Sequence, residues 1–363
     1  MGLGHSSSHI GHVRRLCASG LPIQDFVPEL LRELHAIAPS HSNAIMLSNR
    51  QFDIVGGYGE DPAFFEVLPK YVRDYHDKLA LEVMPPFSTF MRHAPTVTNA
   101  LRVVGDRRRL ERSSWYGEIV HPLGWRNLNY VKVFSGNRPI ALIMQGMDER
   151  RKKITAREGL ALTKLAPFIA HAMTAPATAP ENNVDDDDVG ILVVDADGRV
   201  QHVNAAAKAM LLWDMPALRR TSQRRGGPVI LPGYLLKIIR DLKAASGKGD
   251  DLGDAPSHQH RSTWGTVACR AQWLQSQSEN GAILVTLNRQ VPLDVSVLRR
   301  IQRLNLPARQ ADTCYCLARG MNTAAIAHYL GLSIDAVNWH KRQIYFRLDV
   351  HNAAQLVSKL LSA

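Results

Sequence analysis

The hydrophobic positions of the chain change their spacing from one stretch to the next. From residue 21 they recur every three or four residues, as in an amphipathic helix: Phe26, Leu30, Leu31, Leu34 and Ile37. Two apolar runs, residues 130–134 and 140–144, flank a turn containing Gly and Pro, which predicts a β-hairpin. Residues 155–158 are typical of a capping box that opens a closing helix. We therefore expect an α+β domain over residues 21–175, with an antiparallel sheet flanked by helices.

A second pattern of the same kind covers residues 188–290. Two apolar runs lie on either side of Asp197-Gly198, which predicts a tight hairpin. Asn204 follows in the position of a helix N-cap. Apolar residues in 266–274 and 281–287 predict two closing strands. The sequence thus predicts a second α+β domain.

Residues 291–363 have helical spacing throughout. Gly331 makes a tight turn between two of the expected helices, and Ser333 can cap the longer one, which we expect to end at Leu348. Asn352 begins a last helix. Two helices joined by a tight glycine turn form a helix-turn-helix. We therefore predict an all-α, four-helix C-terminal domain in a multidomain chain.

The segments outside these domains have the composition of irregular chain. Residues 1–20 are rich in His and Ser, and we expect them to form a flexible N-terminal tail. In residues 176–187, Pro and small residues precede a run of Asp, which is typical of an exposed linker. We expect residues 188 and 291 to begin the second and third domains.

The helix that Ser333 opens has two chemically different sides. At 100° per residue, three apolar residues share the side that we expect to be buried: Val337, Ile344 and Leu348. The opposite side gathers polar and aromatic residues: Asn338, Trp339, Arg342, Gln343 and Phe346. Arg can pair with guanine, Asn and Gln can pair with adenine, and aromatic side chains can contact thymine methyl groups. We predict that Asn338, Trp339 and Arg342 read base edges.

Charge also favours a nucleic-acid partner. The chain has a formal net charge of +11, and residues 296–363 contain nine Lys and Arg against three Asp. A basic domain of this kind indicates a polyanionic partner, and we expect double-stranded DNA ahead of a membrane surface. Hydroxyl and basic side chains around the reading face can contact phosphates. Those predicted to do so are Thr323, Ser333, Lys341, Tyr345 and Arg347.

The remaining composition places the protein in a reducing compartment. The four cysteines have no spacing typical of a disulfide framework, and no uncharged apolar run is long enough for a spanning helix or a signal peptide. We expect a cytoplasmic protein without a membrane association. The scattered histidines do not have the spacing of metal ligands, so no metal site and no cofactor are predicted.

The C-terminal pattern resembles the LuxR-type DNA-binding domain. The motifs that carry the resemblance are Leu317-Ala-Arg-Gly320, Leu330-Gly-Leu-Ser333, Val337-x-x-His340 and Arg347-Leu348. The resemblance implies that the helix opened by Ser333 lies in the major groove. It also implies a homodimer, through the last helix or the sensor domains, that acts on the transcription machinery. Five residues depart from the usual pattern: Gln310, Ala336, Asn338, Asp349 and Ala353. They suggest an operator unlike the family's usual ones.

The two α+β domains resemble sensor domains. Residues 114–117, 121–124 and 154–158 make the first domain similar to a GAF domain. The strand-turn-strand arrangement followed by Asn204 makes the second similar to a PAS domain. These resemblances imply control by a small-molecule ligand or a partner, and they leave the ligand-binding residues unknown. We predict a sequence-specific DNA-binding transcriptional regulator.

Two other functions stay open. The first is an interaction adaptor with a degenerate helix-turn-helix, which the five departures would explain and which would lack salt-sensitive DNA binding. The second is a small-molecule enzyme fused to the DNA-binding domain. Its candidate residues would be His93, Asp106, Glu118 and His121, but none has nucleophile–base or metal-ligand spacing. We therefore predict no catalytic residues and a protein that is not an enzyme.

Overall fold

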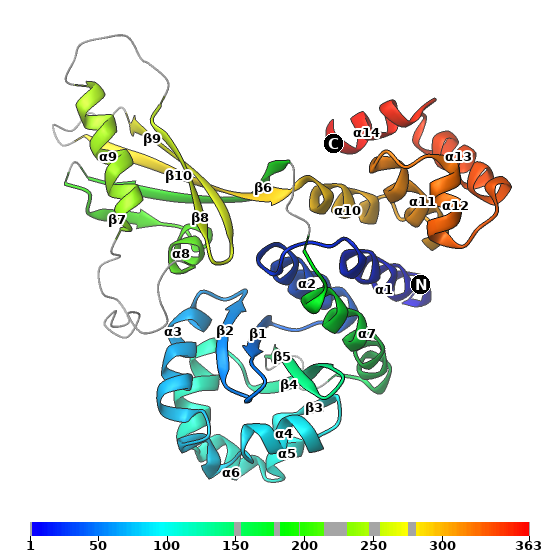
Figure 1. Ribbon diagram of the computed structural model, residues 1–363. Coiled ribbons are helices and arrows are strands. Elements are labelled where there is room, and N and C mark those ends of the chain that lie inside the picture. Colours follow the sequence, from blue (N-terminus) through cyan, green and yellow to red (C-terminus); the bar gives the residue numbers. More distant parts are fainter. Residues whose placement is uncertain are drawn as a thin grey trace.

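Two antiparallel sheets with their helices, and a separate helical domain, make up the chain (Figure 1). In this computed structural model, residues 2–148, 154–177, 182–195, 197–213, 231–246, 255–274 and 281–362 are described. Among these residues, no helix has both the length and the apolar character needed to cross a membrane.

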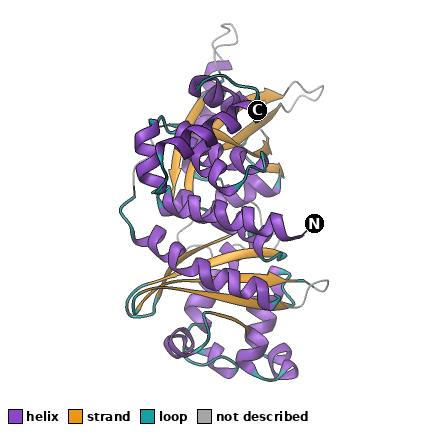
Figure 2. Ribbon diagram, turned by 90° about the vertical axis from the view of Figure 1, so that its right-hand side faces the viewer, coloured by secondary structure: helices purple, strands orange, loops and turns teal. Residues whose placement is uncertain are grey.

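The first domain is built on a five-stranded antiparallel sheet in the order β2-β1-β5-β4-β3. Its strands are β1 (Ser42–Ser48), β2 (Ile54–Gly59), β3 (Val97–Asn99), β4 (Asn127–Ser135) and β5 (Arg138–Met147). The larger helices are α1 (Gly2–Ala18), α2 (Ile23–Ile37), α3 (Ala63–Lys70), α4 (Phe87–His93) and α7 (Ala156–Thr174). Shorter helical segments are η1 (Tyr71–Tyr75), η2 (Leu79–Glu82), α5 (Ala100–Val104), α6 (Arg107–Arg112), η3 (Tyr116–Val120) and η4 (His121–Leu123). Figure 2 shows this sheet as the lower set of orange strands, with helices on both of its faces.

Alternation along the strands sends apolar side chains into two cores, one on each face of this sheet. Ile45 and Ile143 belong to the core beneath α1, α2 and α7, whereas Met46 and Met144 belong to the core beneath α3 and α4. The predicted helix over 26–37 and the predicted hairpin are both confirmed. The capping box is confirmed as well, because Thr155 and Glu158 each bond to the other's backbone.

The N-terminal segment differs from the expected flexible tail of residues 1–20. Residues 2–18 form helix α1, whose side chains Val13, Leu16 and Cys17 are buried against α2, α7 and the C-terminal domain. Gly, Ser and His have weak helix propensity, so the local sequence does not predict this helix. Tertiary packing of one apolar face stabilises it instead.

The second domain has a five-stranded antiparallel sheet with the same pattern of order, β7-β6-β10-β9-β8. Its strands are β6 (Asn183–Val194), β7 (Val200–Val203), β8 (Ser257–Ser262), β9 (Gly265–Leu274) and β10 (Ala282–Pro292), and its helices are α8 (Ala205–Leu212) and α9 (Gly233–Ser246). The predicted hairpin between β6 and β7 is confirmed. Asn204 caps α8 through a bond from the Ala207 N–H at 2.8 Å. Strand β8 was not predicted, because its residues are mostly polar and exposed.

Part of the expected linker, residues 176–187, is instead regular structure. Residues 183–187 belong to β6, where Asp185 pairs with Gln290 of β10. The neighbouring Asp186 is buried and ion-paired with Arg299. A run of acidic residues looks exposed from sequence alone, but a cation from a distant segment compensates this carboxylate here. Residues 178–181 of the expected linker lie outside the described residues.

The C-terminal domain is all-α, and residues 291–362, all of them described, contain five helices rather than the expected four. They are α10 (Leu293–Arg303), α11 (Ala308–Ala318), α12 (Thr323–Leu330), α13 (Ile334–Leu348) and α14 (Ala353–Ser362). The additional helix, α10, follows β10 without a break and packs on both α1 and α11. It therefore connects the sheet of the second domain directly to the helical bundle (Figure 1).

Candidate nucleic-acid interface

Helix α13 is held in place by its two ends and by one buried side. Gly331, with φ of +62°, turns the chain after α12, a conformation that glycine adopts without strain. The Ser333 hydroxyl oxygen then accepts a bond from the Ala336 N–H at 3.1 Å, so the predicted cap is confirmed. Val337, Ile344 and Leu348 are buried, as the angular map predicts. The opposite side of α13 consequently faces away from the core.

The outward side of α13 is open to solvent. Asn338, Arg342 and Gln343 are exposed and make no side-chain hydrogen bond or ion pair within the described residues. Trp339 and Phe346 are 50% and 88% exposed. Large aromatic side chains this accessible mark a contact surface. We call the five residues Asn338, Trp339, Arg342, Gln343 and Phe346 the α13 face.

The residues predicted to contact phosphates lie in different settings. Ser333 is exposed at the N-terminus of α13, where backbone N–H groups also favour an anion. Lys341 lies with its Nζ atom 5.7 Å from the centre of the Tyr345 ring. Arg347 is exposed and donates to the Asn305 carbonyl at 3.5 Å. Thr323 is the half-buried first residue of α12, and Asn322 rather than Thr323 caps that helix.

Tyr345 is not placed as predicted. Its hydroxyl is buried and has no hydrogen-bond partner, and burial raises its pKa. The ring is half-buried and packs against the bundle core. This hydroxyl therefore does not reach a phosphate from its present position.

The basic excess of the C-terminal domain serves more than one purpose. Arg299 is mostly buried in ion pairs with Glu29 and Asp186, Arg300 donates to the Leu360 carbonyl, and Arg319 lies 3.9 Å from Asp294. A count of charges along the sequence assigns all of these residues to the DNA surface. The folded chain uses several of them to attach the domain to its neighbours.

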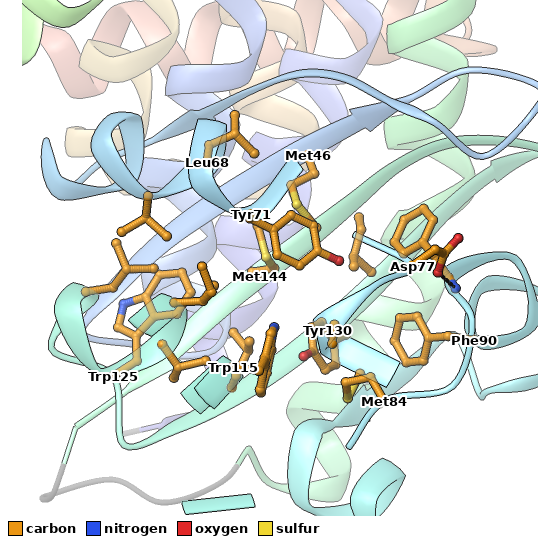
Figure 3. A pocket seen from close by; sticks show the side chains of 18 of the residues that line it. Met46, Leu68, Tyr71, Asp77, Met84, Phe90, Trp115, Trp125, Tyr130 and Met144 are labelled. Atoms are coloured by element: carbon orange, nitrogen blue, oxygen red, sulfur yellow. Dashed lines mark hydrogen bonds between the residues drawn. The ribbon is translucent and has the colours of Figure 1, made fainter. Parts of the chain in front are cut away.

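A cavity of about 60 Å³ in the first domain is the feature that sequence reasoning missed. Figure 3 shows Tyr71, Trp115 and Tyr130 pointing into it from η1, from the residue before η3 and from β4. Met46, Phe90, Trp125 and Met144 supply apolar walls. Its residues come from β1, β4, β5, α3, α4 and the short helices and loops of residues 71–125, so no local motif could have revealed it.

Four polar groups face this otherwise apolar space. The Tyr71 and Tyr130 hydroxyls and the Trp115 indole N–H have no hydrogen-bond partner among the described residues, and Asp77 accepts a bond from the Phe87 N–H at 2.6 Å. Burial raises the pKa of both Tyr71 and Tyr130, so the two hydroxyls stay protonated. Apolar walls with a few unpaired polar groups are the lining of a small-molecule site, although most such sites are larger, at about 300–1,000 Å³.

The residues of the enzyme alternative lie apart from this cavity. Asp106 caps α6, Glu118 pairs with Lys70 at 2.5 Å, and His93 and His121 are exposed at the ends of short helices. None of the four lines the cavity. Among the described residues, no group of three or more His, Cys, Asp or Glu is arranged to hold a metal ion.

Comparison with known proteins gives one family match. Residues 304–360 match the family described as bacterial regulatory proteins, luxR family. No curated protein matches the chain.

Three solved structures resemble the chain only distantly. The LuxR-type receptor VqmA of Vibrio cholerae is 14% identical, with 49% of this chain and 84% of that chain covered and a TM-score of 0.19. The DhaR(N)–DhaL complex of E. coli is 13% identical, with 79% of this chain and 90% of that chain covered and a TM-score of 0.23. The sensor region of a sensor histidine kinase is 15% identical, with 73% of this chain and 90% of that chain covered and a TM-score of 0.17. With TM-scores this low, these likenesses carry no argument.

The family match and the geometry of α11–α14 agree on the same segment. The matched residues begin before α11 and end within α14, so they include the glycine turn, Ser333 and the whole α13 face. The C-terminal segment, residues 304–360, is therefore a helix-turn-helix domain of the bacterial LuxR regulatory family.

Proposed function

We propose that the protein is a sequence-specific DNA-binding transcriptional regulator whose activity a small ligand controls. The observation that carries this proposal is the α13 face, which exposes Asn338, Trp339 and Arg342 on the second helix of a helix-turn-helix. The second helix of this motif enters the major groove. Its exposed amide and guanidinium groups can pair with base edges there.

The base-reading role is tested with Arg342→Ala. A duplex selected from random DNA by the full chain serves as the operator. We expect the variant to bind it about tenfold or more weakly and to accept more sequences, because a bidentate contact to a base is worth about 1–3 kcal/mol. Arg108→Ala removes an exposed guanidinium of α6 and should bind as the unchanged protein does. Equal operator affinity and preference for R342A would contradict the proposed reading face.

The salt dependence of DNA binding distinguishes a DNA-binding regulator from an interaction adaptor. Phe346, 88% exposed, could equally contact a protein surface. Phosphate contacts make DNA affinity fall linearly on a logarithmic scale as salt rises. We expect such a slope for the full chain and a shallower one for Arg347→Ala. An absence of salt-dependent binding to any selected duplex would favour the adaptor.

The two N-terminal domains are proposed to be sensors of the GAF and PAS kinds. Their sheets share one strand order, which supports two related modules. The cavity of the first domain offers apolar walls with Tyr71, Asp77, Trp115 and Tyr130 as polar anchors, and its volume is about 60 Å³, so its ligand would be very small and mainly apolar, with one polar end. We further propose a homodimer, through α14 or the sensor domains, that acts on the transcription machinery.

Ligand binding is tested on purified full-length protein. We expect solvent extraction and mass spectrometry to recover a small apolar molecule, and Leu142→Trp, which fills the cavity from β5, to lose it. Leu274→Trp, at the far end of β9, is a control of the same size change. Equal retention by both variants would contradict a ligand in this cavity.

A further inference from the structure

A second cleft, of about 630 Å³, lies between the first domain and the helix-turn-helix domain. One wall consists of residues from α1 and α7, and the other consists of residues from α11 and α12. Figure 1 shows α1 running beneath α11 and α12, beside α7. The volume is in the range of small-molecule sites, which are frequent at domain interfaces.

The charge of the cleft is positive. Arg14, Arg15 and Arg309 line it together with His171, and the lining contains one carboxylate, Asp312. The Arg15 Nη1 atom lies 2.8 Å from the Asp312 Oδ1 atom, so this carboxylate is already neutralised. Arg14 makes no hydrogen bond or ion pair within the described residues. Arg309 makes one long bond of 3.4 Å to the Leu330 carbonyl. Both guanidinium groups are therefore available to an anion.

Two aromatic rings complete the cleft. Phe168 of α7 and Tyr329 of α12 are 43% and 55% exposed and lie on opposite walls. The Arg14 guanidinium lies 4.8 Å from the centre of the Phe168 ring. A guanidinium on an aromatic face presents a planar surface that both stacks with flat ligands and donates to carboxylate or phosphate oxygens.

We propose that this cleft binds a small planar aromatic anion. Arg14 and Arg309 would hold the anionic group, while Phe168 and Tyr329 would contact the ring. Such a ligand touches the first domain and the helix-turn-helix domain at once, so it would stabilise their present arrangement. The site is distinct from the apolar cavity. Only the regulatory effect of this ligand rests on the proposed function, because the ligand would act by changing DNA binding.

The test measures ligand binding by the full chain without DNA, so its result is independent of DNA recognition. The probes are benzoate, salicylate, indole-3-acetate and adenosine monophosphate, with inorganic phosphate as the non-aromatic comparison. We expect at least one aromatic probe to raise the thermal midpoint and to bind in calorimetry more tightly than phosphate. Which probe binds separates an aromatic carboxylate from a nucleotide as the source of the anion.

Two variants locate the binding. Arg14→Gln should lower the affinity for the aromatic probe about tenfold or more, because a charge-assisted hydrogen bond is lost. Phe168→Ala should lower the affinity for the aromatic probe but leave the affinity for phosphate unchanged. Arg157→Gln, an exposed position near the start of α7, is the matched control and should bind normally. An unchanged circular-dichroism spectrum and thermal midpoint of R14Q without any probe show that the chain is folded. Failure of all four aromatic probes at 10 mM, or unchanged affinity in both variants, would overturn the proposal.

Discussion

At the scale of single residues, Asp349 is the position where α13 ends under strain. It has φ of +50°, and its N–H donates to the Phe346 carbonyl at 3.3 Å. A side chain in the left-handed conformation costs energy that glycine does not incur, and a carboxylate at a helix C-terminus opposes the helix dipole. We expect Asp349→Gly to stabilise the domain by roughly 0.5–1 kcal/mol. Calorimetry would measure this as a higher unfolding midpoint.

Two further substitutions separate the two causes at Asp349. Asp349→Asn removes the charge but keeps a side chain that tolerates the left-handed conformation. Asp349→Ala removes the charge and keeps the strain. We expect stability to rise from alanine to asparagine to glycine. Equal midpoints for aspartate and glycine would show that α13 ends without strain.

At the scale of elements, α1 depends on a buried histidine. His12 is 2% exposed, and burial followed by the charge of Arg15 lowers its pKa to about 3. The other charged groups facing it are His9, Glu29, Glu33 and Arg299. The unfolded chain takes up this proton near pH 6.5, whereas the folded chain does not. The contribution of His12 to the free energy of unfolding is therefore fully present above pH 6.5. It falls by about 1.4 kcal/mol per pH unit as the pH drops from 6.5 towards 3.

Hydrogen exchange of the α1 amides should report this loss. We expect faster exchange at pH 5.5 than at pH 7 after correction for the intrinsic rate, and a weaker pH effect in His12→Gln. Asp25, whose pKa burial raises to about 6, acts in the opposite direction, because its protonation favours the folded state as the pH falls below 6. Comparing the two proteins at each pH cancels that contribution. An identical pH dependence would contradict the role of His12.

The same helix shows where sequence patterns stop being informative. Local signals predicted the caps at Asn204 and Ser333 and the hairpins, because a cap or a turn involves residues a few positions apart. They predicted the buried and open sides of α13 for the same reason. Helix α1 and the buried Asp186 depend on partners more than a hundred residues away, such as Asp312 and Arg299. The cavity likewise exists only after distant segments meet.

At the scale of the whole molecule, one buried ion-pair cluster joins all three domains. Glu29 comes from α2, Asp186 from β6, Arg289 from β10 and Arg299 from α10. Burial alone would raise the pKa of Glu29 and Asp186, but the hydrogen bonds and charge of Arg299 outweigh it, so both pKa values lie below their ordinary range. The Arg299 Nε atom donates to the Glu29 Oε2 atom at 2.7 Å. The helix-turn-helix domain is thus bonded to both sheet-containing domains through one side chain.

Removing that side chain should uncouple the domains. Arg299→Ala leaves two buried carboxylates with the more distant Arg289 and Arg32, whose Nη1 and Nη2 atoms lie 3.7 Å and 3.9 Å from Asp186. Breaking a buried ion pair in this way costs about 3–5 kcal/mol. We expect calorimetry to show a single transition for the unchanged protein and two for R299A, with the C-terminal domain melting separately. The exposed-site variant Arg108→Ala should keep the single transition.

A quadruple substitution distinguishes lost charge compensation from lost packing. Replacing Glu29 by Gln, Asp186 by Asn and both Arg289 and Arg299 by Met removes all four buried charges of the cluster while keeping similar volumes. Because neutral replacements of buried ion pairs are often tolerated, we expect this protein to recover most of the stability that R299A loses. If it melts as R299A does, the coupling comes from the shape of the arginine rather than from its charge. If R299A itself keeps one transition at an unchanged midpoint, the cluster does not hold the domains together.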